Sequence, residues 1–180
     1  MDRLYNIYKT TLNEAKKALS TGKVFPRGLI TDSSKVSESD IDELLEAVDK
    51  AYKEIKLTTS LEEACKDADL IIESMAENPE AKIAFYRSLD PHLEAKTIVA
   101  TNSSSMVPSQ FREYLNRPQQ YLAIHFANNI WISNTAEIMG HSTTSKDAYE
   151  AVAKFASDIK MIPLRLMTVS YTHLTLPTKA

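Results

Sequence analysis

The stretch TIVATNSSS, residues 97–105, decides the fold class. An apolar run of strand length ends there in Asn and Ser, and open α/β sheets place ligand contacts in loops that directly follow a buried strand. The apolar run at residues 70–72 and the stretch YLAIHF at residues 121–126 are predicted as further strands. Between residues 72 and 97, Asn78 and Pro79 predict a helix start, because Asn is a favoured N-cap and Pro a favoured first helical residue. Strands that alternate with helices predict an α/β domain with a mostly parallel sheet.

Further elements are expected on both sides of this stretch. Apolar residues at helical spacing predict two long helices over residues 4–19 and 41–52, joined by a connection at residues 22–36. Ser39 and Asp42 resemble a capping box for the second helix. The remaining predicted elements are a strand at 55–59, a short helix at 61–65, a short helix from Pro108, a strand at 135–139 and a helix at 145–160. The buried side of the helix from Pro79 is expected to consist of Ala81, Ala84, Phe85 and Leu89, and that of the last helix of Val152, Phe155, Ala156 and Ile159.

Composition limits the classes of protein that fit. The 180 residues are 43% hydrophobic and 25% charged, as in globular domains and unlike disordered chains. The net charge of −3 gives no basic excess, so no nucleic-acid partner is expected. No apolar run approaches the roughly 20 residues that span a bilayer, so we expect no membrane partner and a cytoplasmic location. The single Cys65 has no cysteine to pair with inside the chain, and no metal site is indicated.

Three features of the middle of the chain carry candidate chemistry. The Asn and Ser residues at 102–105 either contact a ligand or simply cap the helix near Pro108. His125 ends a predicted strand, where a histidine is either structural or a base. Glu137 stands in an apolar strand, and a buried carboxylate needs a partner because a lone buried charge costs several kcal/mol, as an order of magnitude. His125, twelve residues earlier, is such a partner.

Several blocks together resemble the NAD-dependent 3-hydroxyacyl-CoA dehydrogenase family. These are ADLIIESMAEN at residues 68–78 with Lys82 following, ATNSSSM at 100–106, and IHFAN at 124–128. The spacing from Glu77 to Glu137 through these blocks matches the family pattern without a gap. The resemblance covers residues 1–166, which we interpret as a partial NAD-binding domain.

The resemblance implies a role for each matching residue. His125 takes the proton from the substrate's 3-hydroxyl, Glu137 orients that histidine, and Ser104 hydrogen-bonds the substrate oxygen. The cofactor is expected to be NAD, and its contacts are Glu77, Lys82 and Asn102. Asn128 is expected beside the substrate together with Ser104. His92 and His141 gain no role and are expected at the surface.

The sequence also departs from the family pattern. The family's Phe-Phe-Asn-Pro after the histidine is here FANN at residues 126–129, which removes a fixed backbone φ angle. The family's Gly-x-Gly-x-x-Gly turn, which binds the cofactor pyrophosphate, is not formed by Gly22, Gly28 or Gly140. We therefore expect a partial Rossmann-type, doubly wound sheet without its first βαβ unit, with a helical pair inserted. We expect the family's C-terminal dimerisation domain to be missing too, and residues 167–180 to be a non-native tail, because 169–178 resemble a translated sequencing adapter.

The expected activity of the full-length protein is NAD-dependent interconversion of a 3-hydroxyacyl-CoA and its 3-oxoacyl-CoA, as in fatty acid β-oxidation. Its partners would be an acyl-CoA substrate and a second copy, bound through the C-terminal domain; the 180 residues alone are expected to be inactive. Two alternatives stay open. One is a dehydrogenase of the same superfamily that acts on another hydroxy acid or a sugar acid. The other is a non-catalytic remnant or binding module.

Overall fold

A computed structural model describes residues 1–19, 29–30 and 35–166. The chain forms two compact units. One consists of Met1–Leu57 with Ala127–Asn134, and is called the helical unit below. The other consists of Thr58–Phe126 with the chain from Thr135 onward, and is called the sheet unit. Each described helix is too short or too polar to span a lipid bilayer.

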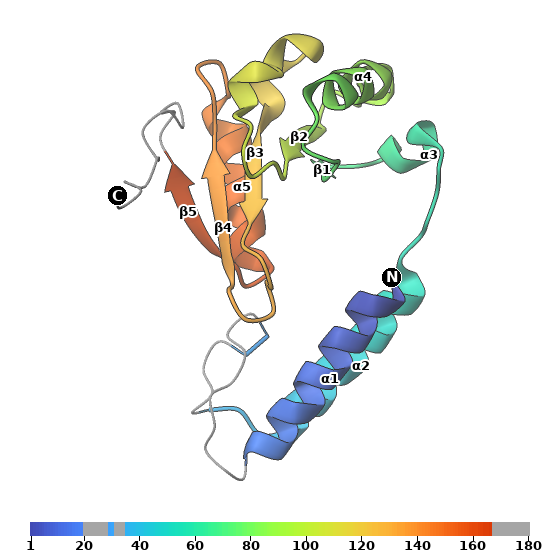
Figure 1. Cartoon of the computed structure of the whole chain (residues 1–180), viewed down its shortest axis with the longest axis vertical. Coiled ribbons are helices and arrows are strands. Elements are labelled where there is room, and N and C mark those ends of the chain that lie inside the picture. Colours follow the sequence, from blue (N-terminus) through green and yellow to red (C-terminus); the bar gives the residue numbers. More distant parts are fainter. Residues whose placement is uncertain (20–28, 31–34, 167–180) are drawn as a thin grey trace, which may run out of the picture. The chain divides into compact units, whose positions relative to one another are not determined.

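The sheet unit contains a five-stranded sheet in the order β1-β2-β3-β4-β5. The strands are β1 (Leu70–Glu73), β2 (Ile98–Thr101), β3 (Tyr121–Phe126), β4 (Thr135–Met139) and β5 (Ile162–Leu166). Neighbouring strands are parallel except β3 and β4, which are antiparallel (Figure 1). The predicted α/β class with a mostly parallel sheet is confirmed. Strand β5 was not predicted; it contains Pro163, which sheets tolerate at an edge strand such as this one.

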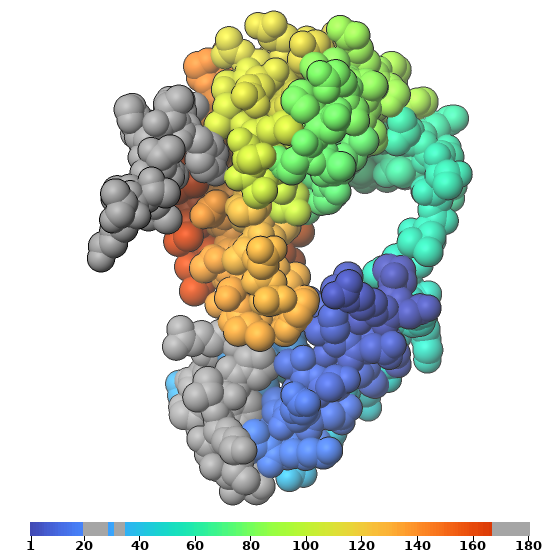
Figure 2. Space-filling model, viewed as in Figure 1, coloured from blue at the N-terminus to red at the C-terminus, as the bar shows by residue number. Residues whose placement is uncertain are grey.

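Helices pack against two parts of the sheet. Helix α5 (Lys146–Asp158), capped by Ser145, packs against β4 and β5. Near β1–β3 lie α3 (Leu61–Cys65) and α4 (Pro79–Leu89). The predicted start of α4 is confirmed, because the Asn78 side chain accepts a hydrogen bond from the Ala81 amide at 2.8 Å. The 3-10 helices η2 (Asp90–His92), η3 (Pro108–Gln110), η4 (Arg112–Tyr114) and η5 (Pro118–Gln120) complete the unit. Figure 2 shows α4 in green and the later 3-10 helices in yellow on the outside of this unit.

The helical unit is built on α1 (Asp2–Ala18) and α2 (Glu38–Glu54), which pack side by side. Its buried core consists of Leu12, Ala15, Ile30 and Ile41. Both predicted helices are confirmed, but the predicted capping box is wrong by two residues. The cap is Ser37, whose hydroxyl accepts from the Asp40 amide while Asp40 accepts from the Ser37 amide. Most of the connection predicted at residues 22–36 lies outside the described residues, as does the tail at 167–180.

Four predictions about strands and buried faces are wrong in whole or in part. Residues 55–59 form no strand: Ile55 and Leu57 are 51% and 78% exposed, and no described strand pairs with them. The buried side of α4 is Lys82, Tyr86 and Leu89, of which only Leu89 was predicted, whereas Ala84 is exposed and Ala81 and Phe85 are half-buried. In α5, Val152 and Ala156 are buried as predicted but Ile159 is 41% exposed, because the helix has ended at Asp158. The apolar run of β1 is only half-buried, since β1 is an edge strand of the described sheet.

The prediction for His141 is also wrong, while His92 is exposed as expected. His141 is 4% exposed, and its ring centroid lies 6.0 Å from that of Tyr121. Burial, followed by the charge of Arg112, lowers the pKa of His141, so the ring is neutral near pH 7. Its position after Gly140 indicated a turn but not that the turn folds back onto β3.

Candidate active site

The predicted contact between His125 and Glu137 is confirmed. The two residues are directly opposite each other in the antiparallel β3–β4 ladder, so their side chains share one face of the sheet. His125 Nδ1 lies 3.0 Å from Glu137 Oε2. The two side chains keep 28% and 38% exposure, so the pair lies at the surface of the sheet unit and not in its core.

This geometry leaves one ring nitrogen available. Glu137 accepts a hydrogen bond from Nδ1–H, and the tautomer that makes this bond carries a free lone pair on Nε2. Nε2 makes no hydrogen bond to any part of the chain that the structure describes. An imidazole held at one nitrogen by a carboxylate and free at the other has the arrangement of a general base.

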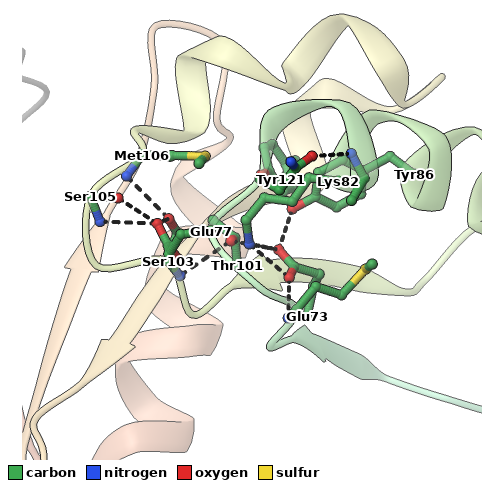
Figure 3. Close-up of polar contacts among 12 residues, drawn as sticks. Glu73, Glu77, Lys82, Tyr86, Thr101, Ser103, Ser105, Met106 and Tyr121 are labelled. Carbon is green, nitrogen blue, oxygen red and sulfur yellow. Dashed lines mark hydrogen bonds and ion pairs between the residues drawn. The ribbon is translucent and has the colours of Figure 1, made fainter.

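A loop that contains Ser104 follows β2 and is held by Glu77 (Figure 3). Glu77 Oε2 accepts hydrogen bonds from the hydroxyls of Ser103 at 2.7 Å and Ser105 at 2.5 Å. The Ser103 hydroxyl in turn accepts from the Met106 amide at 3.1 Å, which tightens the turn. Ser104 is exposed, and its hydroxyl bonds to none of the residues described. The loop therefore presents Ser104 outward while its two serine neighbours anchor it.

The same contacts set the charge of Glu77. Partial burial raises the pKa of this carboxyl, but the hydrogen bonds from Ser105 and Ser103 outweigh burial and hold the pKa below its usual range. Glu77 is therefore ionised at neutral pH. Sequence reasoning placed Glu77 at the cofactor and missed Ser103 and Ser105 as its partners, although hydroxyls that follow a strand end are ordinary donors to a nearby carboxylate.

Lys82, predicted as a cofactor contact, lies inside the protein (Figure 3). Its side chain is 0% exposed, and its ammonium lies 2.8 Å from both carboxylate oxygens of Glu73. Glu73 also accepts from the Tyr86 hydroxyl, the Thr101 hydroxyl and the Met75 amide, at 2.7, 2.8 and 2.5 Å. In this arrangement the ammonium is paired with Glu73 and is not exposed at the surface of the described residues.

The buried network ties α4 to the ends of β1 and β2. Burial raises the pKa of Glu73, but the Lys82 ammonium and the other donors outweigh it, so the pKa stays below its usual range. Tyr86 and Tyr121 share a hydrogen bond of 2.9 Å, and burial raises the pKa of both hydroxyls, which stay protonated. Glu73 was missed from the sequence. It ends an apolar strand, so the argument that gave Glu137 a partner would have found Lys82 as well.

The remaining predicted residues are Asn102 and Asn128. Asn102 follows β2, and its side-chain oxygen accepts a hydrogen bond from the Phe126 amide, next to His125. Asn128 belongs to the helical unit, so its role beside the substrate stays a prediction. In the same loop Asn129 has φ 58°, in the left-handed region that asparagine tolerates and proline, fixed near −65°, does not reach. The loop therefore follows a path that the family's Phe-Phe-Asn-Pro sequence could not adopt at this position.

A mostly parallel sheet with a His–carboxylate pair and polar loops at its strand ends defines the class: an α/β domain of the dinucleotide-binding type. The family model described as "3-hydroxyacyl-CoA dehydrogenase, NAD binding domain" matches residues 3–169. The chain belongs to this family.

Relatives of known or probable activity match this chain over part of their own length. The chain is 33% identical over 107 residues to a probable 3-hydroxybutyryl-CoA dehydrogenase of Bacillus subtilis, a match of 59% of this chain and 37% of that protein. It is 30% identical over 105 residues to an L-carnitine dehydrogenase of Oceanobacillus iheyensis, 58% of this chain and 34% of that protein. Among solved structures, a diketoreductase that acts on dicarbonyl compounds superposes with a TM-score of 0.70 and 35% identity, over 91% of this chain and 54% of that one. The chain thus spans about a third of the curated relatives it matches.

The residues present fit only part of an NAD molecule. Glu77 is an exposed, ionised carboxylate, the usual acceptor for ribose hydroxyls. The pyrophosphate is normally held by backbone amides of a glycine-rich turn at a helix N-terminus, and the three glycines of this sequence are not spaced as Gly-x-Gly-x-x-Gly. The ribose side of the cofactor therefore has a candidate contact here, whereas residues 1–19, 29–30 and 35–166 offer no glycine-rich turn for the pyrophosphate.

Proposed function

We propose that the full-length protein interconverts a 3-hydroxyacyl-CoA and the corresponding 3-oxoacyl-CoA, with NAD as the hydride acceptor or donor. The observation that carries this proposal is the contact of His125 with Glu137, which leaves the outer ring nitrogen free. Family membership supplies the reaction type, and the pair supplies the group that moves the proton.

During oxidation, the substrate's 3-hydroxyl loses its proton to His125 Nε2 as the hydride leaves the third carbon. Glu137 keeps the ring in place and stabilises the imidazolium that results, as an acceptor on the second nitrogen does in other acid–base sites. NAD, when bound, supplies the site that takes the hydride. In reduction, the protonated ring returns the proton to the carbonyl oxygen.

The loop after β2 supports the same reaction. We propose that Ser104 hydrogen-bonds the substrate oxygen and that Glu77 contacts the cofactor ribose while it anchors Ser103 and Ser105. Asn128 is proposed beside the substrate. Lys82 has no part in the proposal, because its ammonium is committed to Glu73.

A second candidate is a dehydrogenase of this family with a different carbonyl substrate. The loop after β3 favours it, because Asn129 takes a backbone conformation that a proline there would forbid. The likeness to a diketoreductase and to L-carnitine dehydrogenases points the same way. Free dicarbonyl compounds and hydroxy acids would then replace the acyl-CoA.

One assay separates these candidates. The full-length protein that contains residues 1–166 is incubated with NADH and acetoacetyl-CoA, a free β-diketone or dehydrocarnitine, and NADH consumption is followed. The first proposal expects kcat/KM to be highest for acetoacetyl-CoA. Preference for the β-diketone or dehydrocarnitine favours the second candidate, and no consumption with any of them favours a non-catalytic remnant.

The domain bounds, the oligomeric state and the location of the protein are also proposals. We infer that residues 1–166 belong to the NAD-binding domain and 167–180 to a non-native tail, which amplification of genomic DNA across Leu166 tests. The full-length protein is proposed as a homodimer through a C-terminal domain. Its unpaired, buried Cys65 is consistent with the reducing cytoplasm.

A further inference from the structure

We propose that Asn102 is a positioning residue for His125 and acts through the last peptide group of β3. The inference rests on the proposed function only in naming His125 the base. Asn102 Oδ1 accepts a hydrogen bond from the Phe126 amide at 3.0 Å. The backbone amide of Asn102 donates to the Glu73 carbonyl at 2.8 Å. One residue therefore bridges the ends of three strands: β1, β2 and β3.

The sheet register explains why this bridge is needed. The β2–β3 ladder ends at the pair of Thr101 and Ala123, while β3 continues for three more residues to Phe126. On its other side β3 stays paired with β4 as far as Phe126 and Ala136. Successive amides of a strand point alternately to its two neighbours, so the Phe126 amide faces the side where β2 has already ended. The Asn102 side chain occupies the place of the missing strand residue.

The bond acts on His125 because of the planarity of the peptide. The amide of Phe126 and the carbonyl of His125 belong to one rigid peptide unit. Fixing the direction of that amide fixes ψ of His125, and with it the direction in which its side chain leaves the backbone. The ring must keep Nδ1 at 3.0 Å from Glu137 to leave Nε2 free, so a rotation of this peptide moves the base directly.

The chemistry also fixes which end of the Asn102 amide is used. The Phe126 amide is a donor, so only the carbonyl oxygen of Asn102 is able to face it. An aspartate would keep that acceptor, whereas an alanine would remove it. This contrast separates an acceptor role from mere filling of space.

Nuclear magnetic resonance on the isotope-labelled 180-residue chain tests the inference. In the unsubstituted chain, the bond predicts a scalar coupling across it, between Phe126 N and Asn102 Cγ. In Asn102→Ala, we expect hydrogen exchange of the Phe126 amide to be roughly 2- to 10-fold faster, the loss of one ordinary hydrogen bond. The ring ¹⁵N signals of His125 should shift toward the mixed-tautomer position, and Asn102→Asp should restore them. Asn116→Ala is the matched control, because the Asn116 side chain binds Asp90 in the same unit and should leave His125 unchanged.

Three results would overturn the inference. One is absence of the coupling in the unsubstituted chain, which does not depend on whether a variant folds. Another is that the His125 ring ¹⁵N signals stay unchanged in Asn102→Ala while the Phe126 amide exchanges faster. The bond would then hold the end of β3 in place without affecting the histidine. The third is an Asn102→Asp chain as altered as Asn102→Ala. None of these readouts requires turnover, so failure of the proposed function, seen as no NADH consumption by the full-length protein, is a separate result.

Discussion

Both units carry ion pairs at their surfaces, but among the described residues only the sheet unit also buries one. The sheet unit buries a complete ion pair, Glu73 with Lys82, with no exposed side-chain surface on either partner. In the described part of the helical unit the ion pairs lie at the surface, among them Lys9 with Asp49, exposed by 27% and 39%, and Lys16 with Asp42, exposed by 32% and 52%. Its interior is aliphatic.

The difference indicates where the molecule is sensitive to substitution. Charges removed from water must be matched one to one, and the loss of a partner leaves a buried charge unpaired. Exposed pairs are screened and contribute little. The buried pair lies at the ends of β1 and β2, from which Glu77, Asn102 and Ser104 emerge, so the sensitive part of the chain is also the part that positions the candidate site.

The largest expected effect follows from breaking the buried pair. Lys82→Met leaves Glu73 charged, buried and unpaired, and should lower the free energy of unfolding of the sheet unit by about 3–5 kcal/mol. Amide exchange in β2 and β3 measures it. Exposed Lys50→Met is the matched control and should change little. The double variant Glu73→Leu/Lys82→Leu should recover much of the loss, and a double variant no better than the single one would contradict the ion-pair account.

The next largest effect is expected in acid, where the stability of the two units should depend differently on pH. The folded-state pKa of Glu73 lies below its ordinary value of 4.5, so its contribution is complete above that pH and is lost as the pH falls through the folded value. The sheet unit should therefore lose stability below about pH 4.5, and Glu73→Gln should flatten that slope. The pKa of Asp49 is lowered too, by hydrogen bonds from Lys9 and Tyr5, but solvent screens this exposed group. Fluorescence of the single Trp131, which packs on Tyr8 in the helical unit, should show the shallower dependence.

A smaller effect tests the start of α2. Ser37→Ala removes the cap and should cost the helical unit about 1 kcal/mol. Ser39 is the second residue of the helix and not its cap, so Ser39→Ala should lower the stability of the helical unit much less. Urea unfolding followed by Trp131 fluorescence measures both. Equal losses would place the helix start at the wrong serine.

The smallest effect is expected at the surface of the helical pair. Asp42→Asn removes the ion pair with Lys16, whose nitrogen lies 2.7 Å from Asp42 Oδ2. The unfolding midpoint should fall by less than for Ser37→Ala, and the difference should vanish at high salt because both groups are exposed. A loss that persists in salt would mean that this pair is more enclosed than its exposure indicates.

Much of the sheet was predictable because local signals agree with the fold. Asn78 followed by Pro79 is a strong local signal for a helix start, and the apolar strand that ends just before Asn102 has the length and boundary of a buried strand. The contact of His125 with Glu137 was predictable for another reason: a carboxylate in an apolar strand needs a partner, and the chain offered one at the right spacing.

The predictions that were wrong concern residues whose surroundings depend on contacts between distant segments. The family resemblance implied a cofactor contact for Lys82, and the helical pattern left it out of the buried side of α4, because a lysine is buried only where another element brings a carboxylate to it. His141 was misplaced for the same reason, since its burial depends on a turn that binds back to the Tyr121 carbonyl. Residues 55–59 had strand-like composition, but a strand also needs a neighbour to pair with, and composition does not reveal one.

The measurement that tests the central claim most directly is the turnover of His125→Gln in the full-length protein, beside its affinity for NAD. If His125 is the base held by Glu137, kcat should fall by about 10²–10⁴-fold, the usual contribution of such a group, while the Kd for NAD stays unchanged. Turnover retained in the variant, or an equal loss of turnover and NAD affinity, would contradict the account and make the pair a structural link between β3 and β4.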